Sequence, residues 1–253
     1  MSFEQARETL SWAQEALDEL DEICCRFFQP GNSKRITQFD IKKREYVDKE
    51  AFTSPFPRAQ AARKATEAIQ SVKNTFDQAT HACVTAIDQT LSEETIYFPW
   101  TDTPTGLDKR LNGKSCKIPS MLWETFRNLQ PYGKGRGYSG GDDVTRRLAK
   151  MANTKHTVGI AIRPRIADMS YRVSAAAAAC LQPVPTWNSQ RNEVEVMRYP
   201  PGPTPQYEYS IYFDVVFDRT TPLKEKRVLE SVRRFATKAE EAITSLEEAA
   251  RAS

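Results

Sequence analysis

Three long segments of the chain carry apolar residues at alternating three- and four-residue steps, and this spacing constrains the fold more than any other feature. It predicts helices over about residues 3–28, 58–91 and 222–250. A period of about 3.5 residues is typical of helices that pack nearly parallel or antiparallel at shallow angles. A bundle would bury all three stripes. We expect this packing to lie within the chain, although the outer helices could instead pair with a second protomer.

Capping residues indicate where several helices begin. Thr221-Pro222 has the residue types of an N-cap and a first helical position, so we expect the last helix to start there. Asp142-Asp143 are expected to cap a shorter helix over 142–152. Another short amphipathic helix is predicted over 120–130, and Asp102 to Pro119 before it has the composition of a polar, turn-rich connection.

Strand signals lie between the helical segments. Residues 35–47 predict a short hairpin that turns near Lys42-Lys43. Further strands are expected within 157–217, at Thr157–Ile162, Glu193–Met197 and Tyr207–Phe217. Tyr171 to Leu181 is ambiguous, because its alanines favour a helix and its position favours a strand.

These elements together predict an α+β fold, a bundle of long helices with a small antiparallel β-sheet. We treat residues 1–253 as a single domain for two reasons. The first and last helices both need packing partners, and a sheet this small rarely folds alone.

Charge and hydropathy limit the classes of partner. The chain carries 36 Lys and Arg against 33 Asp and Glu, a net charge of +3. Nucleic-acid-binding domains usually show a strong basic excess, so this balance does not indicate RNA as a partner. RNA stays an alternative partner. The N-terminus lacks the basic and apolar regions of a signal peptide. The longest weakly polar run, Ala175 to Leu181, is far shorter than the roughly 18 residues of a membrane span. We therefore expect a cytoplasmic protein with no membrane partner.

The five cysteines do not form a metal-binding pattern. Their number is odd, no pair has C-x-x-C spacing, and only His81 and His156 could join them as ligands. We predict no metal and no cofactor, and we interpret the cysteines as small buried apolar residues.

Residues 131–141 are rich in glycine and could be mistaken for a phosphate-binding loop. The segment lacks the preceding strand and the Gly-Lys-Ser/Thr ending of a P-loop, which favours a plain connection between helices. Its Lys134, Arg136 and Tyr138 could still contact a phosphate or a base. We retain Tyr132 and Arg136 as candidate binding residues.

Asn153-Thr154-Lys155-His156 is the candidate catalytic site, at the expected end of the helix over 142–152. An ammonium group beside His156 favours the neutral imidazole, which can act as a base. Lys155 could hold a phosphate, and Asn153 could orient either side chain or the ligand. In the alternative, structural interpretation, which we favour, Asn153 caps the helix while Lys155 and His156 satisfy its terminal carbonyls.

Three polar residues on the second long helix complete the candidates. Lys73 and Asp77 lie four residues apart on one face, which predicts a helical ion pair, and both are kept as candidate binding residues. His81 falls opposite the apolar stripe, so we expect its side chain to be exposed or to face a different neighbour.

Four short motifs occur in a characteristic order: Pro55-Phe56-Pro57, Tyr97-Phe98-Pro99, Leu129-Gln130-Pro131-Tyr132 and Asn153-Thr154-Lys155-His156. In this order they resemble the motifs of a group of uncharacterised bacterial proteins, over about Phe3 to Ala242. The resemblance implies an N-terminal helix, a short hairpin, a long helix, and strands before a last helix.

The long helix of that group bears a segment similar to the arginine–histidine motif of HEPN domains, helical proteins that often act as ribonucleases. The resemblance implies that a histidine and an arginine act at the RNA phosphate. In this chain Lys73 stands at the arginine position and Gln78 at the histidine position. Because the Gln78 amide cannot exchange a proton near neutral pH, we do not expect HEPN chemistry there.

Two hypotheses for the function follow. The first is a non-catalytic binding or assembly protein, distantly HEPN-like, that could form a homodimer through its long helices. The second is a metal-independent ribonuclease or phosphodiesterase that uses His156, Lys155 and Asn153, with Lys73 as a further cation. The glutamine at position 78 favours the first hypothesis.

Overall fold

A computed structural model of the chain describes residues 2–92, 94–114, 116–158, 160–173 and 182–253; the side chains of 154–158 and 182–184 lie outside this description. The chain folds into two compact units. The helical unit comprises Met1–Asp21, Gln60–Ile162 and Phe217–Ser253, and the sheet unit comprises Glu22–Ala59 and Arg163–Val216. Our treatment of residues 1–253 as a single domain stays a prediction.

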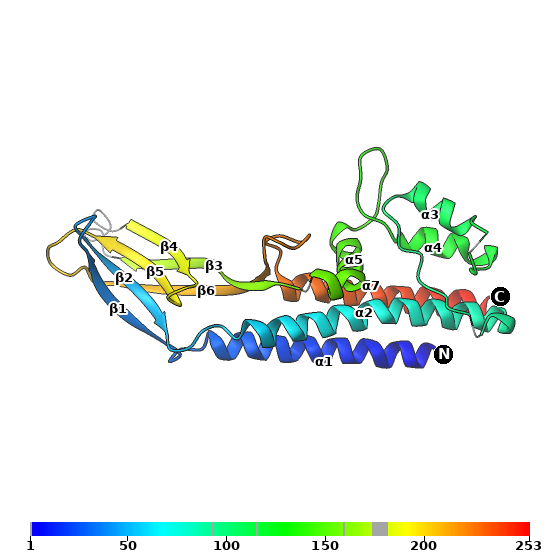
Figure 1. Cartoon of the computed structure of the whole chain (residues 1–253), viewed down its shortest axis with the longest axis horizontal. Coiled ribbons are helices and arrows are strands. Elements are labelled where there is room, and N and C mark those ends of the chain that lie inside the picture. The colour runs from blue at the N-terminus through cyan, green and yellow to red at the C-terminus, as the bar shows by residue number, and fades with distance from the viewer. Residues whose placement is uncertain (1, 93, 115, 159, 174–181) are drawn as a thin grey trace. The chain divides into compact units, whose positions relative to one another are not determined.

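The described elements confirm an α+β fold of long helices with small antiparallel sheets (Figure 1). The α-helices are α1 Phe3–Phe27, α2 Arg58–Ile87, α3 Pro104–Leu111, α4 Trp123–Leu129, α5 Asp143–Val158 and α7 Val228–Arg251, with 3-10 helices at Gln89–Leu91 and Ser120–Leu122. The strands are β1 Ser33–Asp40, β2 Glu45–Phe52, β3 Ile162–Val173, β4 Gln182–Asn188, β5 Glu193–Tyr199 and β6 Tyr207–Phe217.

Within the helical unit, α1, α2 and α7 run side by side, so the apolar stripes pack against one another within the chain, as predicted (Figure 1). The buried faces contain many small side chains: Ala6, Ala13, Ala61, Ala65, Ala68, Ala79, Ala239 and Ala242. Lys64 on α2 forms an ion pair with Glu19 on α1 at 2.8 Å. The ring centroids of Phe76 on α2 and Phe235 on α7 lie 5.4 Å apart. Small residues allow the helices to approach closely, and the larger rings fill the remaining space.

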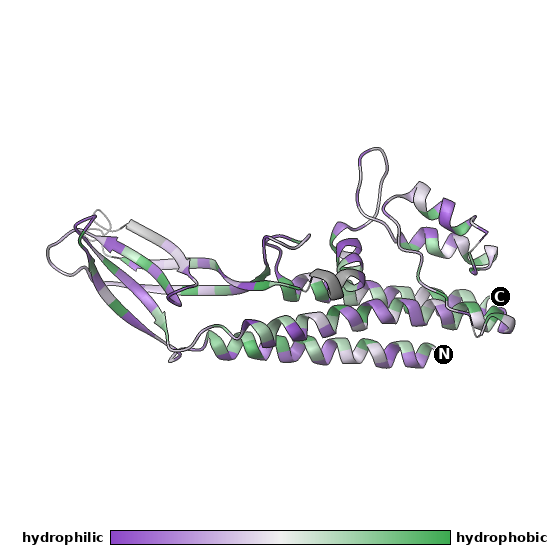
Figure 2. Cartoon of the chain, in the orientation of Figure 1, coloured by the Kyte–Doolittle hydropathy of each residue, from purple (hydrophilic) through white to green (hydrophobic). Residues whose placement is uncertain are grey.

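The helices are amphipathic along their length. Hydrophobic and hydrophilic residues alternate along α1, α2 and α7 in Figure 2. Among the helices that the structure describes, none combines the length and the apolar character that crossing a membrane requires.

Helix α7 begins at Val228, so the predicted start at Thr221-Pro222 is wrong. The intervening residues turn back on the end of β6. The Phe217 N–H donates to the Lys226 carbonyl at 3.0 Å, and the Glu225 N–H donates to the Phe217 carbonyl at 3.1 Å. Glu225 also adopts a left-handed conformation, with φ of 61°. Because these hydrogen bonds hold Glu225 and Lys226 against the end of β6, the helix cannot begin at the expected cap, Thr221.

Helix α3 lies inside the segment that we predicted to be a turn-rich connection, Asp102 to Pro119. The hydroxyl of Thr103 caps this helix by accepting the Gly106 N–H at 3.0 Å, and Pro104 follows at the first turn. Leu107 and Leu111 are buried one turn apart. The Thr-Pro signal is therefore correct here and misleading at Thr221-Pro222.

The sheet unit contains a four-stranded antiparallel sheet in the order β1-β2-β5-β4 and a two-stranded sheet of β3 and β6. The predicted hairpin is confirmed, with Ser33 paired to Phe52 and Asp40 paired to Glu45. The strands predicted at Glu193–Met197 and Tyr207–Phe217 are confirmed as β5 and β6.

Strand β3 begins later than expected, and the structure adds strand β4 within residues 157–217. The strand expected at Thr157–Ile162 is wrong, because α5 continues to Val158 and β3 begins only at Ile162. Of the ambiguous segment, Tyr171–Val173 belongs to β3, and 174–181 lie outside the described residues. Strand β4 contains two prolines, which are tolerated because it lies at an edge of the sheet and its register shifts after Pro183.

A buried carboxylate, Asp48 on β2, connects the two sheets of this unit. Its Oδ2 accepts hydrogen bonds from the Tyr207 hydroxyl on β6 and the Arg35 guanidinium on β1, both at 2.5 Å. Its Oδ1 accepts from Thr37 at 2.6 Å and from Tyr199 at 3.2 Å. The residue is only 1% exposed, so these donors replace the water that the carboxylate loses on folding.

Aromatic side chains surround this polar core. The Arg35 guanidinium lies 4.3 Å from the ring centroid of Tyr207, a cation–π contact. An apolar cluster packs around Val194, Val196 and Met197. The sheet unit thus combines a hydrophobic core with buried, hydrogen-bonded charges, Asp48 and the neighbouring Lys49, whose ammonium binds Gln38 and Glu193.

We expect Asp48→Ala to lower the free energy of unfolding by about 3 kcal/mol, because buried hydroxyl donors and the Arg35 cation would lose their acceptor. Urea denaturation followed by circular dichroism measures the change. The matched control is Glu208→Ala, since Glu208 pairs with Arg172 where the two side chains are 77% and 88% exposed. That change should be within about 0.5 kcal/mol. Equal losses in the two variants would contradict a structural role for Asp48.

The same carboxylate should make stability depend on pH. Burial opposes ionisation, but hydrogen bonds from Thr37, Tyr207 and Arg35 hold the pKa of Asp48 below its usual value. An acid whose pKa falls on folding stabilises the folded state above its unfolded pKa of about 3.9, and this contribution declines as the pH falls through the folded pKa. The difference in unfolding free energy between wild type and Asp48→Ala should therefore be full above about pH 5 and shrink towards pH 2. A difference that grows on acidification would contradict this.

Candidate functional site

The predicted catalytic motif lies within a helix and not at its end. Helix α5 runs from Asp143 to Val158, so the expected end at residue 152 and the capping role of Asn153 are wrong. No glycine or proline occurs between Asp143 and Val158, and nothing in that stretch stops a helix. The side chain of Asn153 is exposed. Those of Lys155 and His156 lie outside the described residues, and their catalytic role stays a prediction.

Lys73 and Asp77 form the predicted ion pair, at 2.5 Å. Asp77 Oδ1 also accepts the backbone N–H of Phe98 at 3.0 Å, and the Lys73 ammonium lies 5.3 Å from the ring centroid of Tyr97. Burial raises the pKa of Asp77, against the opposing effects of Lys73 and the Phe98 N–H. The pair therefore fastens the Tyr97-Phe98 segment to α2.

His81 is buried, at 8% exposure, so of the two expected arrangements the structure has the one in which this side chain faces a different neighbour. Its Nε2 lies 3.2 Å from the Ser92 carbonyl, because the segment after α2 folds back over the end of this helix. Gln78, the residue at the HEPN histidine position, has a buried Oε1 with no hydrogen-bond partner in the described part of the chain.

The cysteines only partly follow the expectation of buried apolar residues. Cys24 and Cys83 are buried, Cys116 is half-buried, Cys25 is exposed, and Cys180 lies outside the described residues. Burial raises the pKa of Cys83 to about 12, so this thiol stays protonated at neutral pH. Over the ranges that the structure describes, no three His, Cys, Asp or Glu side chains gather into a metal-binding group.

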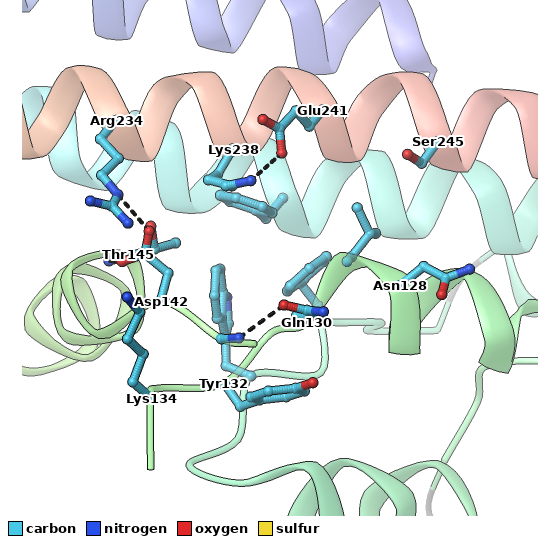
Figure 3. Close-up of a pocket in the computed structure, with 15 residues that line it drawn as sticks. Asn128, Gln130, Tyr132, Lys134, Asp142, Thr145, Arg234, Lys238, Glu241 and Ser245 are labelled. Carbon is cyan, nitrogen blue, oxygen red and sulfur yellow. Dashed lines mark hydrogen bonds and ion pairs between the residues drawn. The ribbon is translucent and has the colours of Figure 1, made fainter. Parts of the chain in front are cut away.

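A pocket in the helical unit is the strongest candidate site. Its cavity volume is about 460 Å³. Phe76, Phe98 and Trp100 form an aromatic wall, with ring centroids 4.7–4.8 Å apart, and Tyr132 also lines the pocket. The polar lining consists of Asn128, Gln130, Lys134, Asp142, Thr145, Arg234, Lys238, Glu241 and Ser245, and Figure 3 shows α7 on one side of the pocket and Gln130 and Tyr132 on the other. Of the predicted binding residues, Tyr132 lines this pocket, whereas Arg136 is exposed and Lys73 and Asp77 lie outside its lining.

Asp142 fixes one wall of the pocket. As predicted, it caps α5, since its Oδ1 accepts the N–H groups of Val144 at 2.8 Å and Thr145 at 3.1 Å. Its Oδ2 binds Arg234 on α7 at 2.5 Å, and its own N–H donates to the Tyr132 carbonyl at 2.9 Å. One residue thus joins α5, α7 and the segment that carries Tyr132 (Figure 3).

Two glycines allow the loop before Asp142 to close tightly. Gly140 and Gly141 adopt positive φ angles of 83° and 76°. A Cβ on Gly141 would lie 2.5 Å from the Gly133 carbonyl oxygen, so a larger residue does not fit. The Gly141 N–H donates to Gln130 Oε1 at 2.9 Å. The glycine-rich segment is therefore part of the pocket wall, through backbone contacts that its composition alone does not predict.

Two buried polar atoms in the pocket lining have no hydrogen-bond partner among the described residues: Trp100 Nε1 and Thr145 Oγ1. The two residues are 9% and 5% exposed. An unsatisfied buried donor usually costs about 1–3 kcal/mol, so native proteins rarely retain one without a water or a ligand to accept its hydrogen. Both atoms can donate, which makes the pocket suited to a hydrogen-bond acceptor.

The remaining charges around the pocket are partly paired. Lys238 forms an ion pair with Glu241 at 2.5 Å, and Arg234 is held by Asp142. Burial raises the pKa of Tyr132, so its phenol remains a neutral donor. Sequence reasoning missed Trp100, Thr145, Arg234 and Lys238, because they come from three separate segments, the residues before α3, α5 and α7, that converge only in the folded chain.

Comparisons with known proteins add no relative. No family model matches this chain, and neither a curated protein nor a solved structure is significantly similar to it.

We expect Asp142→Ala to lower the free energy of unfolding by about 1–2 kcal/mol, mainly through loss of the α5 cap. Asp142→Asn keeps an acceptor for the Val144 and Thr145 N–H groups and removes only the charge. Because the Arg234 side chain is 52% exposed, the ion pair should contribute less than about 1 kcal/mol. Urea denaturation of both variants separates the two contributions. An equal loss in Asp142→Asn would contradict the capping role.

Proposed function

We propose that this protein is a non-catalytic binding protein and that the pocket of its helical unit holds a small ligand. The observation that carries the proposal is the pair of buried, unpartnered donors in the lining, Trp100 Nε1 and Thr145 Oγ1. An acceptor oxygen of a ligand that reached either donor would recover the desolvation cost of leaving it unbonded.

The lining also defines the shape and charge of the ligand. The volume of about 460 Å³ falls within the range of small-molecule sites. Aromatic side chains on one wall suit a planar apolar group. The lining contains three cations, Lys134, Arg234 and Lys238, against two carboxylates, Asp142 and Glu241, and the positive charge in excess suits a carboxylate or another anionic group. An aromatic carboxylate combines these features.

Two features favour binding over catalysis. The lining that the structure describes includes neither histidine nor cysteine, the usual proton-transfer and nucleophilic groups. Asp142 and Arg234 bind each other, and so do Lys238 and Glu241. Because each of these groups is engaged with its partner, it is less available for proton transfer to a ligand.

Thr145→Val tests the proposal, because the change preserves shape and removes only the hydroxyl. We expect the free energy of unfolding to stay equal or rise by up to about 1 kcal/mol, since a buried unsatisfied group is removed. Affinity for an aromatic carboxylate should fall about tenfold. A calorimetric titration with benzoate, salicylate and indole-3-acetate, together with urea denaturation, measures both effects.

The matched control is Thr75→Val on α2. Thr75 is also buried, but its hydroxyl already donates to the Ser71 carbonyl at 2.9 Å and lies outside the pocket lining. This variant should keep wild-type affinity. Absence of binding to all three compounds would contradict the proposed ligand class. The non-catalytic assignment is tested by incubating the protein with RNA in the absence of metal ions. RNA cleavage that is lost in His156→Ala, while the thermal stability of the variant is unchanged, would contradict it.

A further inference from the structure

The turn of the β1–β2 hairpin exposes apolar side chains. Ile41, the first residue of the turn, is 81% exposed, and Phe39, two residues earlier on β1, is 47% exposed. A solvated isoleucine at a turn contributes no hydrogen bond and no packing to the fold. We call residues Phe39–Arg44 the hairpin tip.

The hairpin tip is also positively charged. Lys42, Lys43 and Arg44 follow Ile41 directly, all three are exposed, and none forms an ion pair with a described residue. The acidic residues on either side do not neutralise them. Asp40 and Glu45 instead face Arg198 on β5, at 3.0 Å and 3.7 Å.

The fold holds these residues in a fixed arrangement. Asp40 Oδ1 accepts the N–H groups of Lys42 and Lys43 at 3.1 Å and 3.2 Å, which orders the turn. The ring centroid of Phe39 lies 5.1 Å from that of Tyr46 on β2. Arg44 adopts a left-handed conformation with φ of 55°, where glycine or asparagine is usual. An arginine at such a position costs stability, which is consistent with a use for its side chain.

We propose that the hairpin tip is a docking surface for membranes that contain anionic lipids. Apolar side chains flanked by lysine and arginine can enter the boundary between headgroups and acyl chains while the cations contact the anionic headgroups. Nucleic acid fits the tip less well, because Ile41, its most exposed apolar side chain, offers neither a stacking surface nor hydrogen bonds, and the Phe39 ring already packs against Tyr46. This docking departs from the expectation of no membrane partner, requires no membrane-spanning segment and is independent of the pocket ligand.

Vesicle flotation with the full chain tests the inference. We expect binding to vesicles of phosphatidylcholine with about one-third phosphatidylserine, weakening as salt rises, and little binding to phosphatidylcholine alone. Replacing Lys42, Lys43 and Arg44 singly by Gln should reduce the partition coefficient about five-fold each. Ile41→Asn should reduce it about tenfold or more, because the apolar anchor is lost.

The matched control is Tyr212→Ser on β6, which removes an aromatic side chain that is 60% exposed in the same unit but outside the tip. It should leave vesicle binding unchanged. Ile41→Asn should unfold at the wild-type temperature, because its side chain is exposed; loss of stability would overturn the reading of Ile41 as a free anchor. Absence of vesicle binding, or equal losses in Tyr212→Ser and Ile41→Asn, would overturn the proposal. Binding of a single-stranded RNA through the tip residues without vesicle binding would replace it with the nucleic-acid alternative.

Discussion

The two carboxylate oxygens of Asp142 have different partners, and the pocket of the helical unit depends on that division. Oδ1 caps the first turn of α5, whereas Oδ2 binds Arg234 on α7. Without the cap, the N-terminal turn of α5 that carries Thr145 would lose its position relative to the aromatic wall. The Asp142 side chain therefore sets the distance between the Thr145 hydroxyl on α5 and the cations on α7.

The long helices could be predicted because their signal is local. An apolar residue every three or four positions defines a face wherever the helix finally packs. The predictions failed for segments whose structure depends on residues far away in the sequence. The turn before α7 is set by backbone contacts with Phe217, and the neighbour that covers His81 is the Ser92 segment, which the helical spacing does not identify. The prediction that α5 ends at residue 152 failed for another reason. Asparagine can cap the end of a helix, but its presence at position 153 does not force the helix to end there.

The candidate site was predictable only in part. Tyr132 and the cap at Asp142 follow from the sequence, because turn and capping chemistry is local. The importance of Trp100 and Thr145 rests on the absence of a described hydrogen-bond partner. This property depends on every neighbour in the folded unit, and no spacing of residues encodes it. A tryptophan and a threonine are otherwise ordinary core residues, so sequence alone gives no reason to select them.

The interleaving of the two units determines the order in which the chain can fold during synthesis. The polypeptide passes between the units four times, and the last residue of the sheet unit, Val216, precedes all of α7. Every residue of the sheet unit has therefore been synthesised while the helical unit still lacks one of its three long helices. Helices α1 and α2 must expose part of their apolar faces until α7 emerges from the ribosome. The nascent chain is therefore most prone to aggregation between the synthesis of the sheet unit and the emergence of α7.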